Sequence, residues 1–179
     1  EHMVAHVTGL TIRSLCARLD TMIEGRRLDD NASVMIEYEG GAKGLYWCSQ
    51  IAWGHDNGLS FRIYGTKGSV SWSQENPDRY ELAVSGETKR TVIRGRDRFF
   101  PVAETQVRIP AGHPEGYYEA FANIYRSYCT ALLKRKSGIT PSAECEYPTA
   151  VEGLNGVRFV EAYVESSRGG AVWVELGKR

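Results

Sequence analysis

Alternating apolar and polar residues between positions 32 and 93, interrupted by glycine pairs, constrain the fold of this chain most strongly. Val34 and Ile36 lie on one face of an expected strand, and Gly40 and Gly41 supply the positive φ angles of a hairpin turn. Such a two-residue period is typical of antiparallel sheets that bury one face. The middle of the chain is therefore predicted to be a series of β-hairpins.

The stretch Gly65-Thr66-Lys67-Gly68 is predicted to be one of these hairpin turns. The full spacing of a phosphate-binding loop is missing, and the stretch lies between two strands instead of between a strand and a helix. Nor does Gly-x-Gly-x-x-Gly follow a leading strand, so nothing here would cradle a dinucleotide. Other strands are expected over residues 11–20, 45–52, 59–64, 80–84 and 89–93, around Val70 and Trp72, and over 171–176.

Helix signals occur at the start and in the last third of the chain. A short helix ends at Thr8-Gly9. A long one is expected to begin at Pro114, a favoured first helical residue, and to end near Lys136; another begins at Pro148 and ends at Gly169. The pattern predicts an α+β fold: an open-faced, mostly antiparallel mixed β-sheet with helices on one face, forming a single domain over residues 1–179. Its many aromatic residues favour an interface on the open face.

Composition excludes several classes of function. The 22 basic and 22 acidic residues leave a formal net charge of 0, so we expect neither nucleic acid nor a membrane surface as partner. No apolar run has membrane-spanning length, and no signal-peptide pattern is present. Four widely spaced cysteines, three of them in apolar-patterned segments, favour structural thiols in a reducing cytoplasm.

Histidines are the candidate functional residues. His113 stands at the mouth of the expected helix, where backbone N–H groups favour an oxygen-rich ligand, although an exposed capping histidine is an alternative. His55 lies in a loop and is more strongly favoured as an exposed residue without a ligand, whereas Trp53, Asp56 and Asn57 around it could contact a sugar hydroxyl or a neighbouring subunit. His2 and His6 have the spacing of zinc ligands on a helix, but no third ligand follows, and exposed residues are favoured. Residues 94–100, with three arginines, are expected to form a solvated loop.

An ordered set of segments resembles the C-terminal half of the nicotinamide-dependent oxidoreductases related to glucose–fructose oxidoreductase and inositol dehydrogenase, the Gfo/Idh/MocA family. The segments are Asp29 to Val34, Phe61 to Trp72 with its Tyr-Gly-x-Lys-Gly turn, His113 to Tyr125, Tyr147 to Thr149 with Arg158 to Arg168, and Gly170 to Val174. The resemblance covers nearly the whole chain.

This resemblance implies hydride exchange between NAD or NADP and a hydroxyl carbon of a sugar, inositol or related polyol. The Rossmann domain that binds the cofactor in this family is absent from the chain, which is expected to bind no cofactor and to be inactive alone. The usual catalytic lysine and histidine would both precede Glu1, so no catalytic residue is assigned, and His2 and His6 do not inherit that role. No metal site is expected.

The turn His113-Pro114-Glu115-Gly116-Tyr117 is expected to border the substrate, with His113, Glu115 and Tyr117 as substrate-binding residues. The resemblance also implies a homodimer or homotetramer that assembles through the open sheet. The alternative is a non-catalytic binding or dimerisation module. A glycine-rich βαβ unit encoded before Glu1 would distinguish the enzyme from the module.

Overall fold

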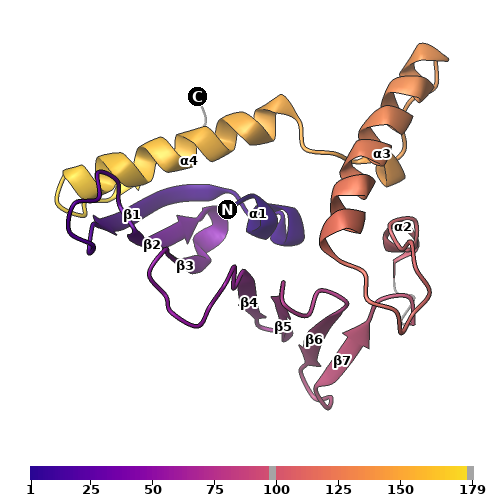
Figure 1. Cartoon of the computed structure of the whole chain (residues 1–179), viewed down its shortest axis with the longest axis horizontal. Coiled ribbons are helices and arrows are strands. Elements are labelled where there is room, and N and C mark those ends of the chain that lie inside the picture. Colours follow the sequence, from indigo (N-terminus) through magenta and orange to yellow (C-terminus); the bar gives the residue numbers. More distant parts are fainter. Residues whose placement is uncertain (97–99, 177–179) are drawn as a thin grey trace. The chain divides into compact units, whose positions relative to one another are not determined.

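The computed structural model describes residues 1–96 and 100–176, which form two compact units (Figure 1). One unit contains Glu1–Gly54 with Pro148–Arg179, and the other contains His55–Tyr147. Each unit has its own four-stranded sheet, and every strand pair in the described part of the chain is antiparallel. The predicted α+β class, open-faced and largely antiparallel, is confirmed.

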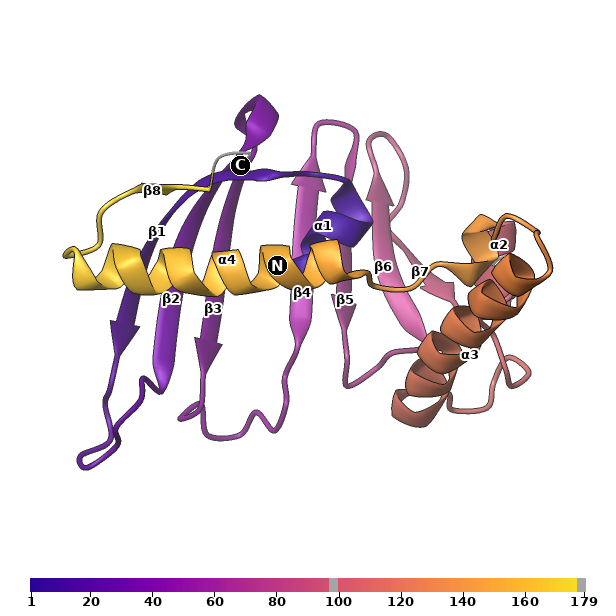
Figure 2. The same ribbon diagram turned by 90° about the horizontal axis from the view of Figure 1, so that it is seen from above.

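The first unit is a sheet of strand order β3-β2-β1-β8 with the long helix α4 running across one face (Figure 2). The expected glycine hairpin is present between β2 and β3, where Gly40 and Gly41 have φ angles of 79° and 90°. The elements of this unit are α1 (His2–Thr8), β1 (Ile12–Asp20), β2 (Asn31–Tyr38), the 3-10 turn η1 (Glu39–Gly41), β3 (Lys43–Ser49), α4 (Ala150–Arg168) and β8 (Val174–Glu175).

The core of the first unit lies between this sheet and α4. Leu15 and Ile36 face each other across β1 and β2 and are at most 1% exposed. Ser166 of α4 connects the two layers, since its Oγ accepts from Ala17 N at 2.8 Å and donates to Val172 O at 2.5 Å. Apolar burial and a buried hydroxyl thus fix the same contact.

The opposite face of this sheet keeps large apolar side chains in solvent. Met35, Leu45 and Trp47 are 49%, 74% and 63% exposed. Met35 pairs with Leu45 in the β2–β3 register, and the indole N–H of Trp47 donates to Asn31 Oδ1 at 2.9 Å. The face is therefore apolar and partly ordered by its own hydrogen bonds.

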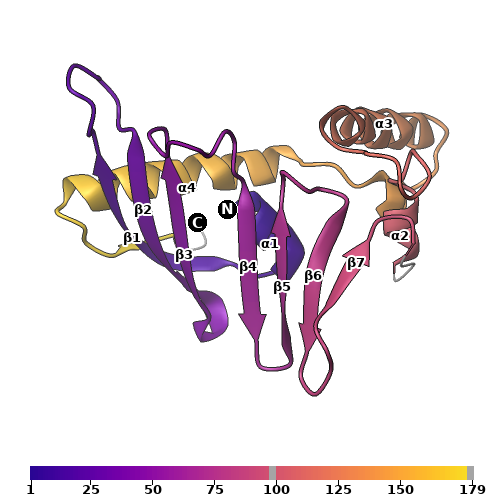
Figure 3. The same ribbon diagram turned by 60° about the horizontal axis from the view of Figure 1, so that its bottom comes forward.

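The second unit contains the strands β4 to β7 in sequence order, side by side (Figure 3). Their register gives the sheet two unlike faces: Ile63, Val70 and Leu82 align on one, and Arg62, Ser71 and Glu81 on the other. The elements of this unit are β4 (Ser60–Gly65), β5 (Gly68–Ser73), β6 (Arg79–Val84), β7 (Arg90–Ile93), α2 (Pro101–Glu104), α3 (Tyr117–Lys136) and the 3-10 turn η2 (Ala143–Cys145).

The β4–β5 turn confirms the hairpin prediction, because Gly65 and Gly68 pair directly across it. Gly68 is also in close contact with β6. A Cβ atom built on Gly68 would lie 2.2 Å from the carbonyl oxygen of Ala83, a distance that no side chain can occupy without movement of the backbone. Glycine at position 68 is therefore required by strand packing, and not by its φ angle, which lies outside the left-handed region.

Several boundaries differ from the predicted ones. Helix α3 begins at Tyr117 instead of Pro114, because the preceding residues are held in a separate turn described below. The last strand is limited to Val174–Glu175, since Ala171 has a φ of 62° and its N–H bonds back to Ser166 O. All four cysteines carry free thiols; Cys16 and Cys145 are buried, whereas Cys48 and Cys129 are exposed, so the expectation of three buried cysteines is wrong.

Within the described residues, none of the helices combines the length and the apolar content that crossing a bilayer requires.

Candidate functional site

The segment between α2 and α3 contains a tight turn that determines where His113 lies. The N–H of His113 donates to Pro110 O at 3.2 Å, which closes a four-residue turn. Gly112, the third residue of this turn, has a φ of 92°, a conformation that favours glycine. The imidazole Nδ1 of His113 also lies 3.2 Å from Pro110 O. The ring is exposed and anchored at one nitrogen.

Glu115 braces this turn from inside. Its side chain is 5% exposed, and its carboxylate accepts from two successive amides: Oε1 from Arg108 N at 2.8 Å and Oε2 from Ile109 N at 3.1 Å. Hydrogen bonds from N–H groups to an ionised acceptor are stronger than those between neutral groups. Glu115 therefore closes residues 108–115 into a loop whose two ends are joined by a charged group.

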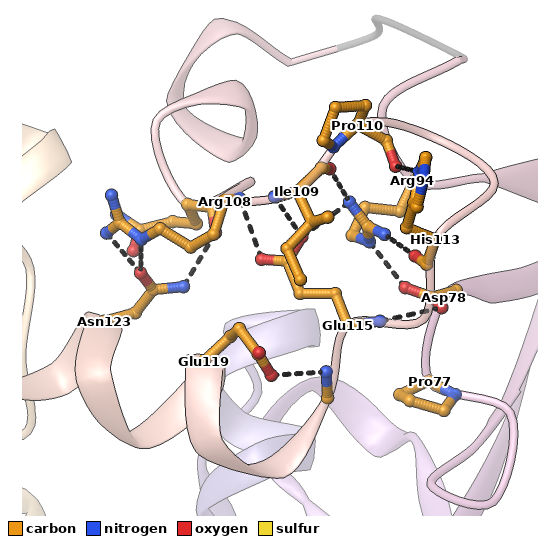
Figure 4. A network of polar contacts seen from close by, with 12 residues as sticks. Pro77, Asp78, Arg94, Arg108, Ile109, Pro110, His113, Glu115, Glu119 and Asn123 are labelled. Atoms are coloured by element: carbon orange, nitrogen blue, oxygen red, sulfur yellow. Dashed lines mark hydrogen bonds and ion pairs between the residues drawn. The ribbon is translucent and has the colours of Figure 1, made fainter.

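An ion-pair cluster ties this loop to the sheet (Figure 4). The guanidinium of Arg94, just after β7, lies 2.6 Å from Glu115 Oε2 and 2.5 Å from Asp78 Oδ1. Asp78 Oδ2 in turn accepts from Glu115 N at 3.2 Å. Two carboxylates thus share one guanidinium, and one of them also binds the backbone of the other.

The far side of the loop is fixed to α3. Arg108 donates through Nε to Asn123 Oδ1 at 2.6 Å and also bonds the same oxygen through Nη2. The Asn123 amide donates to Gln106 O at 2.7 Å. Arg126 Nη1 donates to Thr105 O at 2.9 Å. The helix and the segment before the loop therefore hold each other through side chains of α3.

The N-terminus of α3 is capped from within the helix. Glu119 Oε2 accepts from Gly116 N at 3.0 Å. The pKa of Glu119 lies below its ordinary value, first because of this hydrogen bond and also because of the positive charge of Arg94. The negative side chain near the positive end of the helix dipole is stabilising. This cap uses a donor that an anionic ligand would otherwise bind.

A hollow of about 520 Å³ lies next to this cap, between residues 75–79 and 114–119. Tyr117 and Tyr118, which are 69% and 83% exposed, lie edge to face at its rim with ring centroids 5.9 Å apart. Asp78 and Glu115 also line it. The exposed aromatic rings suit a neutral polyhydroxyl ligand, since such rings pack against its C–H groups.

A ligand role for the three predicted residues stays a prediction, and the structure gives each a different position. Glu115 and Tyr117 line the hollow, but His113 is not among its lining residues. Both carboxylate oxygens of Glu115 are already bonded within the protein. Of the two predicted residues that line the hollow, Tyr117 is far more exposed than Glu115. His113 lies on the adjacent turn.

Sequence reasoning missed Arg94, Asp78 and Arg108. The expectation that residues 94–100 form a solvated loop is wrong for Arg94, whose side chain is only 18% exposed; residues 97–99 lie outside the described part of the chain. One signal was present in the sequence, because Glu115 stands between Pro114 and Gly116. A charged residue between a proline and a glycine indicates a turn, and the charge of a buried side chain there needs an oppositely charged partner.

The other candidate residues, His2, His6 and His55, are not placed in a cluster of metal-ligating side chains within the described residues. The rings of His2 and His6 lie 6.4 Å apart, and within residues 1–96 and 100–176 no group of three His, Cys, Asp or Glu side chains is placed to hold a metal ion. His55 is exposed in the loop before β4. The N-terminus of α4 is capped by Thr149 and Glu152, as that of α3 is by Glu119.

Comparisons with known proteins identify relatives of this chain. Residues 3–176 match a family model described as the oxidoreductase family, C-terminal alpha/beta domain. An uncharacterized oxidoreductase of Bacillus subtilis, YfiI, is 36% identical over 163 residues, which are 90% of this chain and 42% of that protein.

Solved structures agree with this match. An oxidoreductase from Sinorhizobium meliloti superposes with a TM-score of 0.91 at 41% identity, covering 97% of this chain and 49% of that one. An inositol dehydrogenase homolog from Azotobacter vinelandii, complexed with NADH and myo-inositol, gives a TM-score of 0.87 at 33% identity, covering 97% and 47%. The chain spans less than half the length of these relatives. It belongs to the Gfo/Idh/MocA oxidoreductase family and forms the C-terminal alpha/beta domain of that family.

Proposed function

We propose that the gene product containing this chain is a dehydrogenase that exchanges a hydride between NAD or NADP and a hydroxyl carbon of a sugar, inositol or related polyol. In this reaction the substrate loses a hydride and a hydroxyl proton and becomes a carbonyl compound. The chain contributes the wall against which the substrate lies. The observation that carries the proposal is the braced turn of His113, held beside a hollow rimmed by Tyr117 and Tyr118.

The proposed tasks of the chain are to bind and to orient. His113 offers an exposed ring, anchored through Nδ1 to Pro110 O, whose other nitrogen can bond a substrate hydroxyl. Tyr117 offers an aromatic face. Glu115 acts mainly by holding the turn, because both of its oxygens have partners in the protein. The inositol dehydrogenase homolog, complexed with a polyol, supports this class of substrate.

A nicotinamide cofactor would supply the hydride acceptor, but the residues that the structure describes do not fit its binding. The glycine-rich turn at 65–68 joins two antiparallel strands, and α3 and α4 both have N-termini capped by their own side chains. A pyrophosphate would find no free row of amides there. We therefore expect the 179-residue chain alone to show no saturable binding of NADH or NADPH by calorimetry; micromolar binding would contradict this.

The activity itself is tested with the full gene product. We expect reduction of NAD⁺ or NADP⁺ in the presence of myo-inositol, glucose or another neutral polyol, followed by the absorbance of the reduced nicotinamide. A panel of such polyols that yields no turnover with either cofactor, in folded protein, would overturn the proposal.

The substrate role of His113 has its own test. His113→Ala should lower kcat/KM by roughly one to two decades, because one hydrogen bond to substrate contributes about 1–3 kcal/mol. His55→Ala, another exposed histidine of the same unit, is the matched control and should change kcat/KM less than about twofold. A His113→Ala enzyme within twofold of the parent would leave His113 as an exposed turn residue.

A second candidate function is a binding or assembly module without catalysis, favoured by the apolar open face with Met35, Leu45 and Trp47. The dehydrogenase and this face are compatible, and we propose that the gene product forms homodimers or homotetramers through it. Trp47→Glu should then shift the mass measured by light scattering toward the monomer. A monomeric parent protein at high micromolar concentration would contradict the assembly.

We also propose a cytoplasmic location, supported by the four free thiols, since secreted proteins tend to oxidise such residues to disulfides. Cell fractionation that finds the protein outside the cytoplasm would refute it.

A further inference from the structure

Arg94 and Arg96 are two positions apart but have different surroundings. The backbone N–H of Arg94 donates to Asp78 O at 2.9 Å, which fixes its main chain beside the start of β6. The Arg94 side chain is 18% exposed, whereas Arg96 is exposed. A guanidinium that gives up most of its hydration needs acceptors for its N–H groups. The identity of those acceptors therefore indicates what Arg94 does.

All three nitrogens of the guanidinium have acceptors in the protein (Figure 4). Nε donates to Asp78 Oδ1 at 2.5 Å, and Nη2 donates to His113 O at 2.7 Å. Nη1 donates to Ile109 O at 2.7 Å and lies 2.6 Å from Glu115 Oε2. One planar group thus contacts the sheet and three residues of the loop that carries His113.

Two of these acceptors are backbone carbonyls at the two ends of the turn closed by Pro110 and His113. Fixing Ile109 O and His113 O sets the separation of the chain on either side of that turn. Glu115 reinforces it by accepting the amides of Arg108 and Ile109. The carbonyl of His113 is held directly, so the direction in which its Cα–Cβ bond leaves the backbone is held as well.

We infer that Arg94 is the positioning residue of the substrate-facing turn: it sets the place of His113 without touching substrate itself. This inference rests on the proposed function, because the turn must border the substrate for its position to affect turnover. Lysine cannot replace Arg94 in this role. An ammonium has its three donors on one atom, whereas the guanidinium presents donors along a fork that reaches four residues at once.

A double-mutant cycle in the full gene product tests the inference, with NAD⁺ or NADP⁺ and the polyol that the panel above shows to be turned over fastest. Arg94→Lys should raise KM about tenfold and change kcat less than about threefold, because substrate binding weakens while the reacting groups outside the turn stay intact. In the His113→Ala background, Arg94→Lys should raise KM less than about twofold, since the residue through which it acts is gone.

Arg96→Lys is the matched control, with the same chemical change in the same segment at an exposed position. It should leave KM and kcat unchanged. If Arg94 only supported folding, Arg94→Lys would reduce the amount of active enzyme, and kcat would fall with KM unchanged. That result, or an equal rise of KM with and without His113, overturns the inference.

Amide hydrogen exchange adds a readout that does not depend on activity. In Arg94→Lys, the amides of Arg108, Ile109 and His113 should exchange at least about tenfold faster than in the parent and in Arg96→Lys, because their turn loses an anchor. Unchanged exchange overturns the inference. If His113→Ala lowers kcat/KM but Arg94→Lys has no effect, only the inference fails; if His113→Ala is silent, the proposed substrate role fails first.

Discussion

Different interactions stabilise the interior of each of the two units. In the first, Leu15 and Ile36 lose nearly all contact with solvent between β1, β2 and α4. In the second, ion pairs and hydrogen bonds among Arg94, Asp78 and Glu115 join the loop before α3 to the segment before β6. Apolar burial is non-directional and depends on area, whereas charge-assisted hydrogen bonds depend on the direction of each donor. The first arrangement suits a scaffold, and the second suits a surface that must present groups at defined positions.

Leu15→Ala should have the largest effect on stability, since it removes a side chain that is 0% exposed from the centre of the first core. We expect a loss of about 3 kcal/mol in the free energy of unfolding, measured by urea denaturation. Leu28→Ala, at 78% exposure in the loop between β1 and β2, should cost less than about 1 kcal/mol. Equal losses would mean that burial does not decide what the loss of a leucine side chain costs in this unit.

Glu115→Gln should have the next largest effect, and it acts on the polar unit. The amide keeps the shape of the side chain but removes the charge that pairs with Arg94 and turns one acceptor into a donor facing an amide or the guanidinium. We expect a loss of about 2 kcal/mol, within the range for hydrogen bonds to charged groups. Glu75→Gln, also at the hollow, serves as the control. If Glu115→Gln left the free energy of unfolding unchanged, the charge of Glu115 would not be needed to hold the loop.

Ser166→Ala measures how much the stability of the first unit depends on a buried polar contact. The substitution leaves the Ala17 amide and the Val172 carbonyl without their hydroxyl partner in a fully buried position, so we expect a loss of about 1–2 kcal/mol. Ser167→Ala, whose hydroxyl accepts from Leu19 N at 3.0 Å in a less buried position, should cost less. The reverse order would contradict the assignment of Ser166 to the core.

The smallest effect on stability is expected from lowering the pH, through the titration of Asp30. Asp30 is 3% exposed and accepts from the amides of Met22 and Ile23 at 2.9 and 3.1 Å; these bonds, that of Met22 first, hold its pKa below the ordinary value of an aspartate. A carboxyl group with a lowered pKa stabilises the fold above its unfolded pKa, about 4, and that contribution is lost as the pH falls through the folded value.

Asp30→Asn should therefore flatten the dependence of unfolding on pH below about 4 and leave its shape above that range unchanged. Asp56→Asn, at an exposed position in the loop before β4, is the control. An Asp30→Asn profile parallel to that of the parent would show that Asp30 is not the titrating group.

The sequence predicted the apolar unit better than the polar one, for a physical reason. A two-residue period specifies which side chains share a face, and Val34, Ile36 and Tyr38 are buried together as that period requires. Ion pairs leave no such period. Nothing local indicates that Arg94 meets Glu115, 21 positions away, instead of solvent, and the start of α3 was misplaced because that contact determines it.

The histidine turn was recognised from its residues and from its resemblance to the family, but the residues that hold it were not. His113 and Tyr117 stand in a motif that can be read in order along the chain. Arg94 and Asp78 come from other parts of the second unit and reach the turn through hydrogen bonds and ion pairs. Residues that position a site without forming its motif become visible only when the donors and acceptors are placed in space.

The contact of Gly68 with β6 has a consequence for how this sequence can vary. The turn residues Thr66 and Lys67 are exposed and free of such a constraint, whereas any Cβ at position 68 meets the Ala83 carbonyl. A library randomised over residues 66–68 and selected for folded protein should thus return many residue types at the first two positions and glycine alone at the third. The hairpin sequence would vary at positions 66 and 67 and remain invariant at position 68, where the backbones of β5 and β6 are in close contact.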